Sequence, residues 1–204
     1  REIKAMGRKA RMISANLAKD KEVKRMFKEI KKFASKLDLV VNNAGFDYAK
    51  LIEDFSLEEM REVIDVVLFG KISITKLALP LLKKSGSPSI INIASRMGKE
   101  KTIRTIGAYG PAEAGVIKFT QVCALEFADY GIRVNCIAPG LTETDMTRNL
   151  FHDEKDWERF ANSNPSRRVG HTQDVANTIS FIASEKASYI NGETIGVNGG
   201  SNLG

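Results

Sequence analysis

The feature that most constrains the fold of this chain is a regular alternation of short apolar segments with longer segments of helical periodicity. The segments 11–15, 37–41, 89–94, 132–137 and 194–197 each have the length and composition of a β-strand. The segments 20–36, 56–82, 107–130, 153–162 and 173–184 are predicted helices. Such alternation indicates βαβ units, and therefore an α/β fold with a doubly wound parallel sheet covered by helices on both faces.

Local signals mark several helix ends. Ser56, followed at the third position by Glu59, is a capping box and predicts a helix start. Asp20 is the expected cap of the first long helix. Pro80 is expected to bend or end the 56–82 helix, because proline has no backbone N–H to donate.

The composition is typical of one globular domain. Of the 204 residues, 43% are hydrophobic and 27% are charged, which excludes a disordered chain and allows a sizeable core. No apolar run approaches the roughly 18 residues of a membrane helix, and the segment Arg1–Lys4 lacks the apolar stretch of a secretory signal. We therefore expect residues 1–204 to form a single cytoplasmic domain that binds no membrane.

The net charge of +6 comes from one end of the chain. Residues 1–36 hold 13 Lys and Arg against 4 Asp and Glu. Within 20–36 the apolar residues recur at helical spacing and leave the lysines mostly on the other side, which indicates a solvated helix face. The sequence has no interleaved aromatic platform and no motif that reads nucleic acid, so we expect no nucleic-acid partner.

Cysteine and histidine are too sparse for a disulfide framework or a metal site. Cys123 and Cys136 each lie in an apolar stretch, which favours buried free thiols. His152 and His171 have no accompanying cysteine or carboxylate constellation, so no metal site is predicted.

Informative residues follow three predicted strands at their carboxyl ends, where parallel sheets bind ligands. One strand runs into 42–45, the next into Ser95, and the third into Pro139 and Gly140. Tyr109 lies 14 residues after Ser95, near the start of a predicted helix. Singly, each of these is compatible with an ordinary turn or strand end. Together, a phenol and a hydroxyl at one sheet edge favour proton transfer to a carbonyl oxygen, with Ser95 orienting and Tyr109 donating.

From about residue 10 onward the chain resembles the short-chain dehydrogenase/reductase family, and within it 3-oxoacyl-carrier-protein reductases and glucose dehydrogenases. The matching motifs, in order, are NNAG at 42–45, NIAS at 92–95 with Gly98, Tyr109 with AG at 114–115, GIRVN at 131–135, APG at 138–140 with TDM at 144–146, and NGE at 191–193 with VNGG at 197–200. The resemblance implies a Rossmann-like fold and hydride exchange between NAD or NADP and a small-molecule carbonyl or alcohol substrate.

The resemblance also implies roles for individual residues. Ser95 and Tyr109 would be catalytic. The residues implied to contact the cofactor are Asn43, Ala44, Gly45, Pro139, Gly140 and Thr144, of which the first three would also brace the central strand and the last three would hold the nicotinamide end. The 107–130 helix and the C-terminal strand are similar to subunit interfaces of the family, which implies a homo-oligomer, either a dimer or a tetramer.

Three positions depart from the family pattern. Glu113 stands four residues after Tyr109, where the family usually carries a lysine that stabilises the phenolate and binds the ribose. A carboxylate at this position has the reverse effect on the phenol. Val67 replaces an asparagine that anchors a water of the proton relay, so Glu113 and Val67 belong with the candidate catalytic positions. Asn16 replaces an acidic residue that contacts adenine and can still form hydrogen bonds there.

Other lysines are poor substitutes for the one replaced by Glu113. Lys118 lies nine residues after Tyr109, which places it on the opposite side of the helix. Lys99 and Lys101 follow Ser95 closely enough to reach the site, although loop lysines are usually solvated.

No two glycines in the sequence are separated by a single residue, so no Gly-x-Gly phosphate loop is present. We therefore expect an N-terminally incomplete domain, which lacks the first βαβ segment of the family. The residue that discriminates NAD from NADP would fall in that segment, so the sequence does not indicate the choice.

Two functions remain open at this point. The first is an NAD(P)-dependent oxidoreductase with a hydroxy or keto substrate of the 3-oxoacyl or the sugar/polyol type. The second is a catalytically impaired member of the family that acts as a binding or scaffold protein, because Val67 and Glu113 disrupt the relay. The substrate pocket would lie in loops 99–106 and 149–168, where the segment 151–160 with Trp157 is either a mobile lid or a surface helix.

Overall fold

The computed structural model describes residues 2–99, 102–148 and 153–203. At its centre is a parallel four-stranded sheet in the order β1-β2-β3-β4, formed by β1 (Leu39–Asn42), β2 (Ser89–Ile93), β3 (Arg133–Pro139) and β4 (Thr194–Val197). The register places Asn42 beside Asn92 and Asn92 beside Cys136. This sheet confirms the predicted α/β class.

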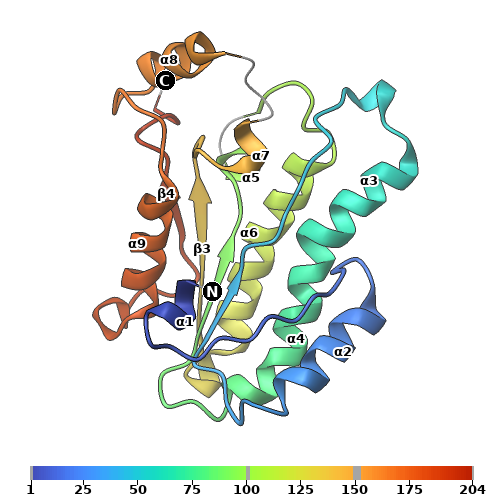
Figure 1. Cartoon of the computed structure of the whole chain (residues 1–204), viewed down its shortest axis with the longest axis vertical. Helices are drawn as coiled ribbons and strands as arrows, with labels where there is room; N and C mark the ends of the chain where they lie inside the picture. The colour runs from blue at the N-terminus through green and yellow to red at the C-terminus, as the bar shows by residue number, and fades with distance from the viewer. Residues whose placement is uncertain (1, 100–101, 149–152, 204) are drawn as a thin grey trace.

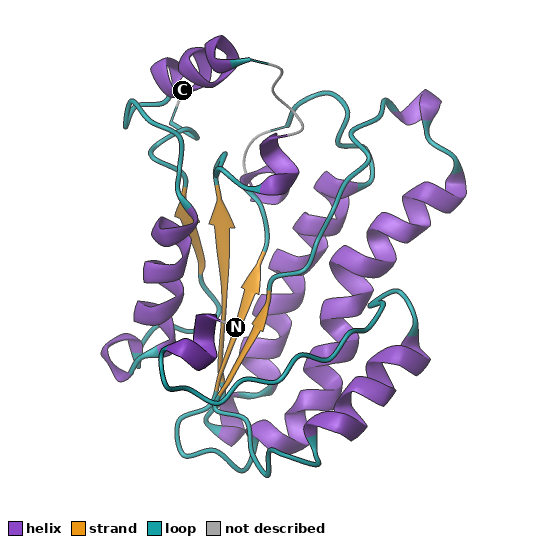
Figure 2. Cartoon of the chain, viewed as in Figure 1, coloured by secondary structure: helices purple, strands orange, loops and turns teal. Residues whose placement is uncertain are grey.

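Helices cover both faces of the sheet (Figure 1). The longer ones are α2 (Asp20–Ile30), α3 (Leu57–Ile64), α4 (Gly70–Leu82), α6 (Tyr109–Glu126), α8 (Glu154–Ser163) and α9 (Thr172–Ala183). Single turns form α1 (Glu2–Ala5), α5 (Arg96–Lys99) and α7 (Asp145–Arg148). Helices α4 and α6 pack on one face of the sheet and α9 packs on the other. Figure 2 shows all strand arrows pointing to one end of the molecule, the end that carries α5, α7 and α8 in Figure 1.

The segment 11–15 is not a strand, so that prediction is wrong. A strand needs a neighbour that pairs with its backbone N–H and C=O groups, and this segment has none among the described residues. Side chains tie it to α2 instead, through an ion pair of 3.2 Å between Arg11 and Glu29 and a hydrogen bond from Arg25 to the Ser14 carbonyl. Among the described residues, the sheet therefore ends at β1.

The helix ends follow the sequence signals in part. Ser56 caps α3 as predicted, with reciprocal hydrogen bonds between Ser56 and Glu59. The predicted 56–82 helix is continuous but contains a π-helical turn at Asp65–Phe69, and α4 continues two residues past Pro80. Asp20 is the first residue of α2 rather than its N-cap. The N-cap is Lys19, whose side chain forms no capping hydrogen bond.

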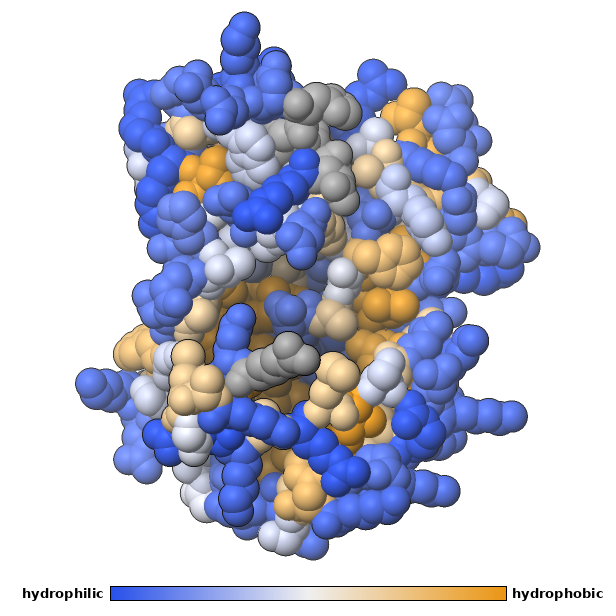
Figure 3. All heavy atoms as spheres, in the orientation of Figure 1, coloured by the Kyte–Doolittle hydropathy of each residue, from blue (hydrophilic) through white to orange (hydrophobic). Residues whose placement is uncertain are grey.

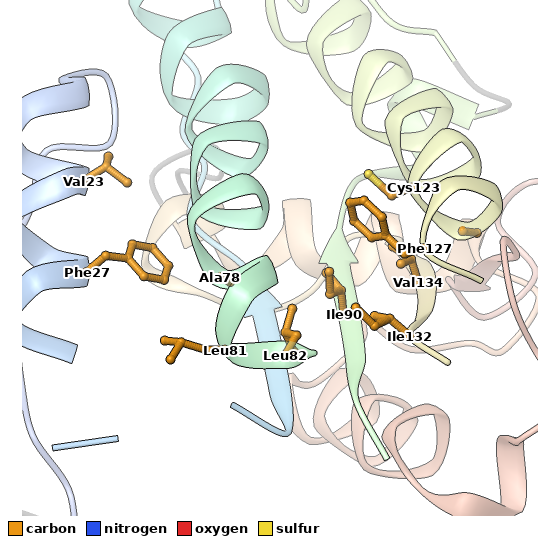
Figure 4. Close-up of a cluster of buried hydrophobic side chains, with 11 residues drawn as sticks. Val23, Phe27, Ala78, Leu81, Leu82, Ile90, Cys123, Phe127, Ile132 and Val134 are labelled. Carbon is orange, nitrogen blue, oxygen red and sulfur yellow. The ribbon is translucent and has the colours of Figure 1, made fainter. Parts of the chain in front are cut away.

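The main hydrophobic core lies between α2, α4, α6 and the sheet. Val23 and Phe27 extend from α2 toward α4, and Leu82, Ile90 and the residues around Cys123 continue the cluster across the sheet (Figure 4). A second cluster, which includes Val67 and Cys136, lies nearer the carboxyl ends of the strands. Each large aliphatic side chain buried in this way contributes about 1.5–3 kcal/mol, which fixes the helices that carry the candidate site. Both cysteines are free and buried, as predicted.

The surface combines polar rims with apolar residues in a recess on the face drawn in Figure 3. At the open edge of the sheet, Leu39 and Val41 of β1 are each 38% exposed. Among the described residues, no helix is both long and apolar enough to cross a membrane.

Candidate active site

The residues predicted at the strand ends meet at one edge of the sheet. Asn42 ends β1, Ser95 follows β2, and Pro139 ends β3. Tyr109 is the first residue of α6, and this end of α6 lies beside α5 (Figure 1). The parallel sheet therefore brings together segments that are far apart in the sequence, as the motif positions predicted.

A buried polar bridge supports this edge from below. The Asn42 side chain donates to Thr75 Oγ1 (3.2 Å) and to Asn92 Oδ1 (2.8 Å), and Asn92 donates to Thr120 Oγ1 (2.9 Å). The bridge joins β1 to α4, β2 and α6. The bracing contacts thus come from Asn42, whereas Asn43, Ala44 and Gly45 form an exposed loop beyond it.

Close packing of α5 on α6 sets the position of Ser95 relative to Tyr109. A Cβ on Gly98 would lie 2.5 Å from backbone atoms of Glu113 and Ala114, so only glycine allows this approach. The Met97 N–H donates to Ser95 Oγ (3.2 Å), which holds the serine at the start of α5. The side chains of Glu113 and Ser95 lie close enough to the Tyr109 hydroxyl that both act on its pKa.

Tyr109 is held in its protonated form. Burial raises the pKa of its phenol well above the usual range, and the negative charge of Glu113 raises it further, while the hydrogen bond from Ser95 opposes the shift. The effect of Glu113 has the direction expected from the sequence. A phenol in this state is a proton donor rather than a base.

Glu113 is itself an unusual carboxyl group. It is only 2% exposed, and its Oε2 atom has no hydrogen-bond partner. Burial raises its pKa to about 7, against the opposing effects of the Lys71 charge and the Tyr109 hydroxyl. It therefore changes protonation near neutral pH, which an exposed glutamate does not.

Lys71, which no sequence motif marked, lies near Glu113 and one helical turn after Val67. Lys71 is 1% exposed, and burial lowers its pKa while the Glu113 charge opposes this change. A signal for its burial was present, because Val63, Val67, Lys71 and Thr75 recur every four residues on one helix face and all are buried. Of the two loop lysines close enough in sequence to replace the missing cation, Lys99 is exposed, as loop lysines usually are. Lys101 lies outside the described residues.

Val67 lies in the π-helical turn between α3 and α4. It is fully buried and packs in the apolar cluster that also contacts Tyr109. A Cβ on Gly45 would lie 3.8 Å from Val67 Cγ2, so the loop after β1 passes directly over this side chain. The position is therefore apolar packing and offers no side-chain partner for a relay water.

The loop after β3 is built around backbone and hydroxyl contacts. The Gly140 N–H donates to the Val197 carbonyl (2.9 Å), and a Cβ on Gly140 would lie 2.8 Å from Asn198 Cα. Thr144 precedes α7, where its hydroxyl lies 3.1 Å from that of Thr147. Glycine at 45 and at 140 leaves little side-chain bulk after β1 and β3, at the strand ends where parallel sheets bind dinucleotides.

The remaining predicted positions lie farther out or elsewhere. Asn16 forms a turn before α2, accepting from the Ala18 N–H (2.9 Å), and the adjacent Leu17 packs against Gly70 at the start of α4. The segment 154–163 is helical, and His152 and Phe151 lie outside the described residues. In residues 2–99, 102–148 and 153–203, no group of three His, Cys, Asp or Glu side chains is arranged to hold a metal.

A groove of about 860 Å³ borders the N-terminal end of α6. Its apolar lining residues are Leu51, Ile52, Met97, Ile103, Ile106 and Pro111. Arg96, next to Ser95, is turned away from solvent, donates to Ser201 Oγ (2.9 Å) and lies over the ring of Phe160 in α8. Of the predicted pocket loops, 99–106 thus lines this groove, and α8 contacts Arg96 beside Ser95.

Comparison with known proteins identifies the fold. The family model described as enoyl-(acyl carrier protein) reductase matches residues 1–202. A 3-oxoacyl-[acyl-carrier-protein] reductase of Staphylococcus epidermidis is 40% identical over 199 residues, which are 98% of this chain and 80% of the relative. The chain belongs to the short-chain dehydrogenase/reductase family.

Solved structures of this family superpose closely on the chain. A gluconate 5-dehydrogenase of Burkholderia cenocepacia, in complex with NADP and tartrate, has a TM-score of 0.92 at 25% identity and covers 100% of this chain and 79% of its own. An aldohexose dehydrogenase of Thermoplasma acidophilum has a TM-score of 0.90 at 31% identity, covering 96% and 80%. Membership of the short-chain dehydrogenase/reductases confirms the predicted family, the Rossmann-like fold class and an NAD(P)-dependent oxidoreductase.

Proposed function

We propose that this short-chain dehydrogenase/reductase reduces the keto group of a 3-oxoacyl thioester, with Tyr109 as the proton donor. The observation that carries the proposal is the buried Tyr109 phenol, which burial and Glu113 keep protonated, at the end of α6 that borders the groove. The groove lining combines polar residues, among them Glu53 and Arg104, with an apolar part around Ile52, Ile103 and Ile106 that would suit an acyl chain. The 40% identity to a 3-oxoacyl reductase supports the same substrate class over the sugar/polyol type.

In the proposed reaction Ser95 donates a hydrogen bond to the keto oxygen and orients it toward the Tyr109 hydroxyl. Tyr109 then transfers its proton as negative charge develops on that oxygen. A bound NADH or NADPH supplies the hydride. The raised pKa of Tyr109 favours reduction over alcohol oxidation, because oxidation would require the phenolate as the base.

The cofactor would lie along the strand ends in this proposal. Pro139, Gly140 and Thr144 would contact its nicotinamide end, and Asn43, Ala44 and Gly45 would line its path. Asn16 would contribute at the adenine end.

The test is oxidation of NADH and NADPH in the presence of a 3-oxoacyl thioester, an aldose and a polyol. The proposal expects turnover with the thioester, and Ile103→Glu should raise KM for long acyl chains far more than for short ones. Faster turnover with the sugars would overturn the substrate class. Absence of turnover with every substrate, together with undetectable cofactor binding by calorimetry, would favour the scaffold alternative.

The same proposal includes a cytoplasmic homo-oligomer, a dimer or tetramer. The exposed face of α6 carries Val122 and Leu125, which are 43% and 81% exposed, and Phe69 before α4 is 56% exposed. Apolar side chains on neighbouring helices form the kind of face that a second copy covers.

A further inference from the structure

Two ionisable side chains are buried behind Tyr109, and a simple proton donor does not require both. Glu113 lies one helical turn after Tyr109 on α6, on the same face. Lys71 reaches the same interior from α4, directly after the π-helical turn. Both residues are almost fully buried, at 2% and 1% exposure, and buried charges are rare unless they are paired or functional.

The contacts order these groups into a chain. Glu113, one turn after Tyr109 on α6, and Ser95 both act on the Tyr109 hydroxyl, and Lys71 acts on Glu113 through its charge. The Oε2 atom of Glu113 is left without a hydrogen-bond partner. A purely structural glutamate would be expected to use both oxygens, because an unmet buried acceptor is costly. The free oxygen leaves Glu113 able to carry and release a proton.

We propose that Glu113 returns a proton to Tyr109 after each reduction and that Lys71 holds the resulting carboxylate. This inference rests on the proposed reductase function. When Tyr109 has given its proton to the substrate oxygen, the O–H bond of the Glu113 carboxyl breaks and a new O–H bond forms on the phenolate. The Glu113 carboxylate, stabilised by the charge of Lys71, then binds one hydronium-derived proton from solvent, so each turnover consumes one solvent proton and both groups return to their starting protonation states. Glu113 is the catalytic residue of this step, and Lys71 is a positioning residue that acts through it.

Several other ionisable groups lie near Glu113, and the pKa of each is shifted in its own direction. Lys71 faces it from α4, Tyr109 from its own helix, and Cys136 from β3. Burial raises the pKa of the Cys136 thiol to about 12, so it stays neutral near pH 7. Asp47, on the loop after β1, acts on Tyr109, and burial raises its pKa. Glu113, with its pKa of about 7, is therefore the carboxyl matched to a proton relay at neutral pH.

The first experiment follows the protonated carboxyl band of Glu113 by infrared titration of the protein without cofactor, with Glu113→Gln to assign the band. The midpoint is expected near pH 7 in the wild type. It should move upward in Lys71→Met, because the Lys71 charge lowers the pKa of Glu113. Lys76→Met, an exposed lysine of the same helix, is the matched control and should leave the midpoint unchanged.

The second experiment is the pH profile of kcat/KM for reduction of a 3-oxoacyl thioester. In the wild type kcat/KM should fall about tenfold per pH unit above a midpoint near that of the carboxyl band, and the fall should begin at higher pH in Lys71→Met. Glu113→Gln should lower kcat on the order of a hundredfold and remove the fall. Turnover that ignores the carboxyl midpoint would overturn the relay and leave the reductase standing. A wild type with no turnover at all would overturn the reductase proposal and the relay with it.

Discussion

Replacing Glu113 by glutamine should change how the stability of the protein depends on pH. Glu113 is 2% exposed and its pKa is about 7 in the folded chain, compared with 4.5 for an ordinary glutamate. The folded state therefore binds a proton over a range in which the unfolded chain has already released it. The contribution of Glu113 to stability is greatest below pH 4.5, falls as the pH rises toward 7, and is constant above that range.

The size of the effect follows from the two pKa values. A free energy of about 1.4 kcal/mol for each pH unit between them gives about 3.5 kcal/mol in total, of which about 2.5 kcal/mol falls between pH 5 and pH 8. Urea unfolding of the wild type and of Glu113→Gln at several pH values in this range measures the difference. The wild type should lose about 2.5 kcal/mol that the variant keeps.

The double variant Lys71→Met/Glu113→Gln serves as the control. It removes both buried ionisable groups, so its stability should not follow this titration. Equal losses in the wild type and in Glu113→Gln between pH 5 and pH 8 would refute the assignment of a raised pKa to Glu113. If the wild type instead becomes more stable relative to the variant over this range, the charge of Lys71 lowers the pKa of Glu113 by more than burial raises it.

Three further predictions concern packing and assembly. Gly98→Ala should destabilise the fold by about 2 kcal/mol and lower turnover, because its Cβ would clash with the α6 backbone. Gly86→Ala is the control, because a Cβ there would have no atom within 4 Å, and it should leave thermal melting unchanged. Asn42→Ala should cost about 2 kcal/mol in urea unfolding by leaving buried partners unsatisfied, and a neutral result would remove the bridge from the account. Leu125→Glu should lower the mass seen in sedimentation, and an unchanged mass would place the interface elsewhere.

Much of the fold follows from the sequence because its signals are local. The capping box at Ser56 predicts the start of α3, and the apolar segments 89–94 and 194–197 each predict a strand that the structure contains. The segment 11–15 has the composition of a strand but no neighbour to pair with among the described residues, and pairing is a property of the whole sheet. Composition alone therefore predicted a strand at 11–15. In the structure the segment is irregular, and its side chains contact α2.

The candidate site was predictable where a motif fixes it and not where packing does. Ser95 and Tyr109 follow from strand ends and a helix start. Lys71 was missed because lysine is ordinarily a surface residue, and only the packing of α4 against α6 shows that this one is buried. The sequence indicated the effect of Glu113 on the phenol, but the raised pKa of Glu113 itself depends on burial in the folded chain.

The most direct test of the proposed function compares the wild type with Tyr109→Phe. The measurement is oxidation of reduced nicotinamide cofactor that depends on a 3-oxoacyl thioester, with thermal melting to show that both proteins are folded. We expect turnover in the wild type, a loss of at least about a hundredfold in Tyr109→Phe, and similar melting of the two. Equal turnover in the two proteins would contradict the assignment of Tyr109 as the proton donor.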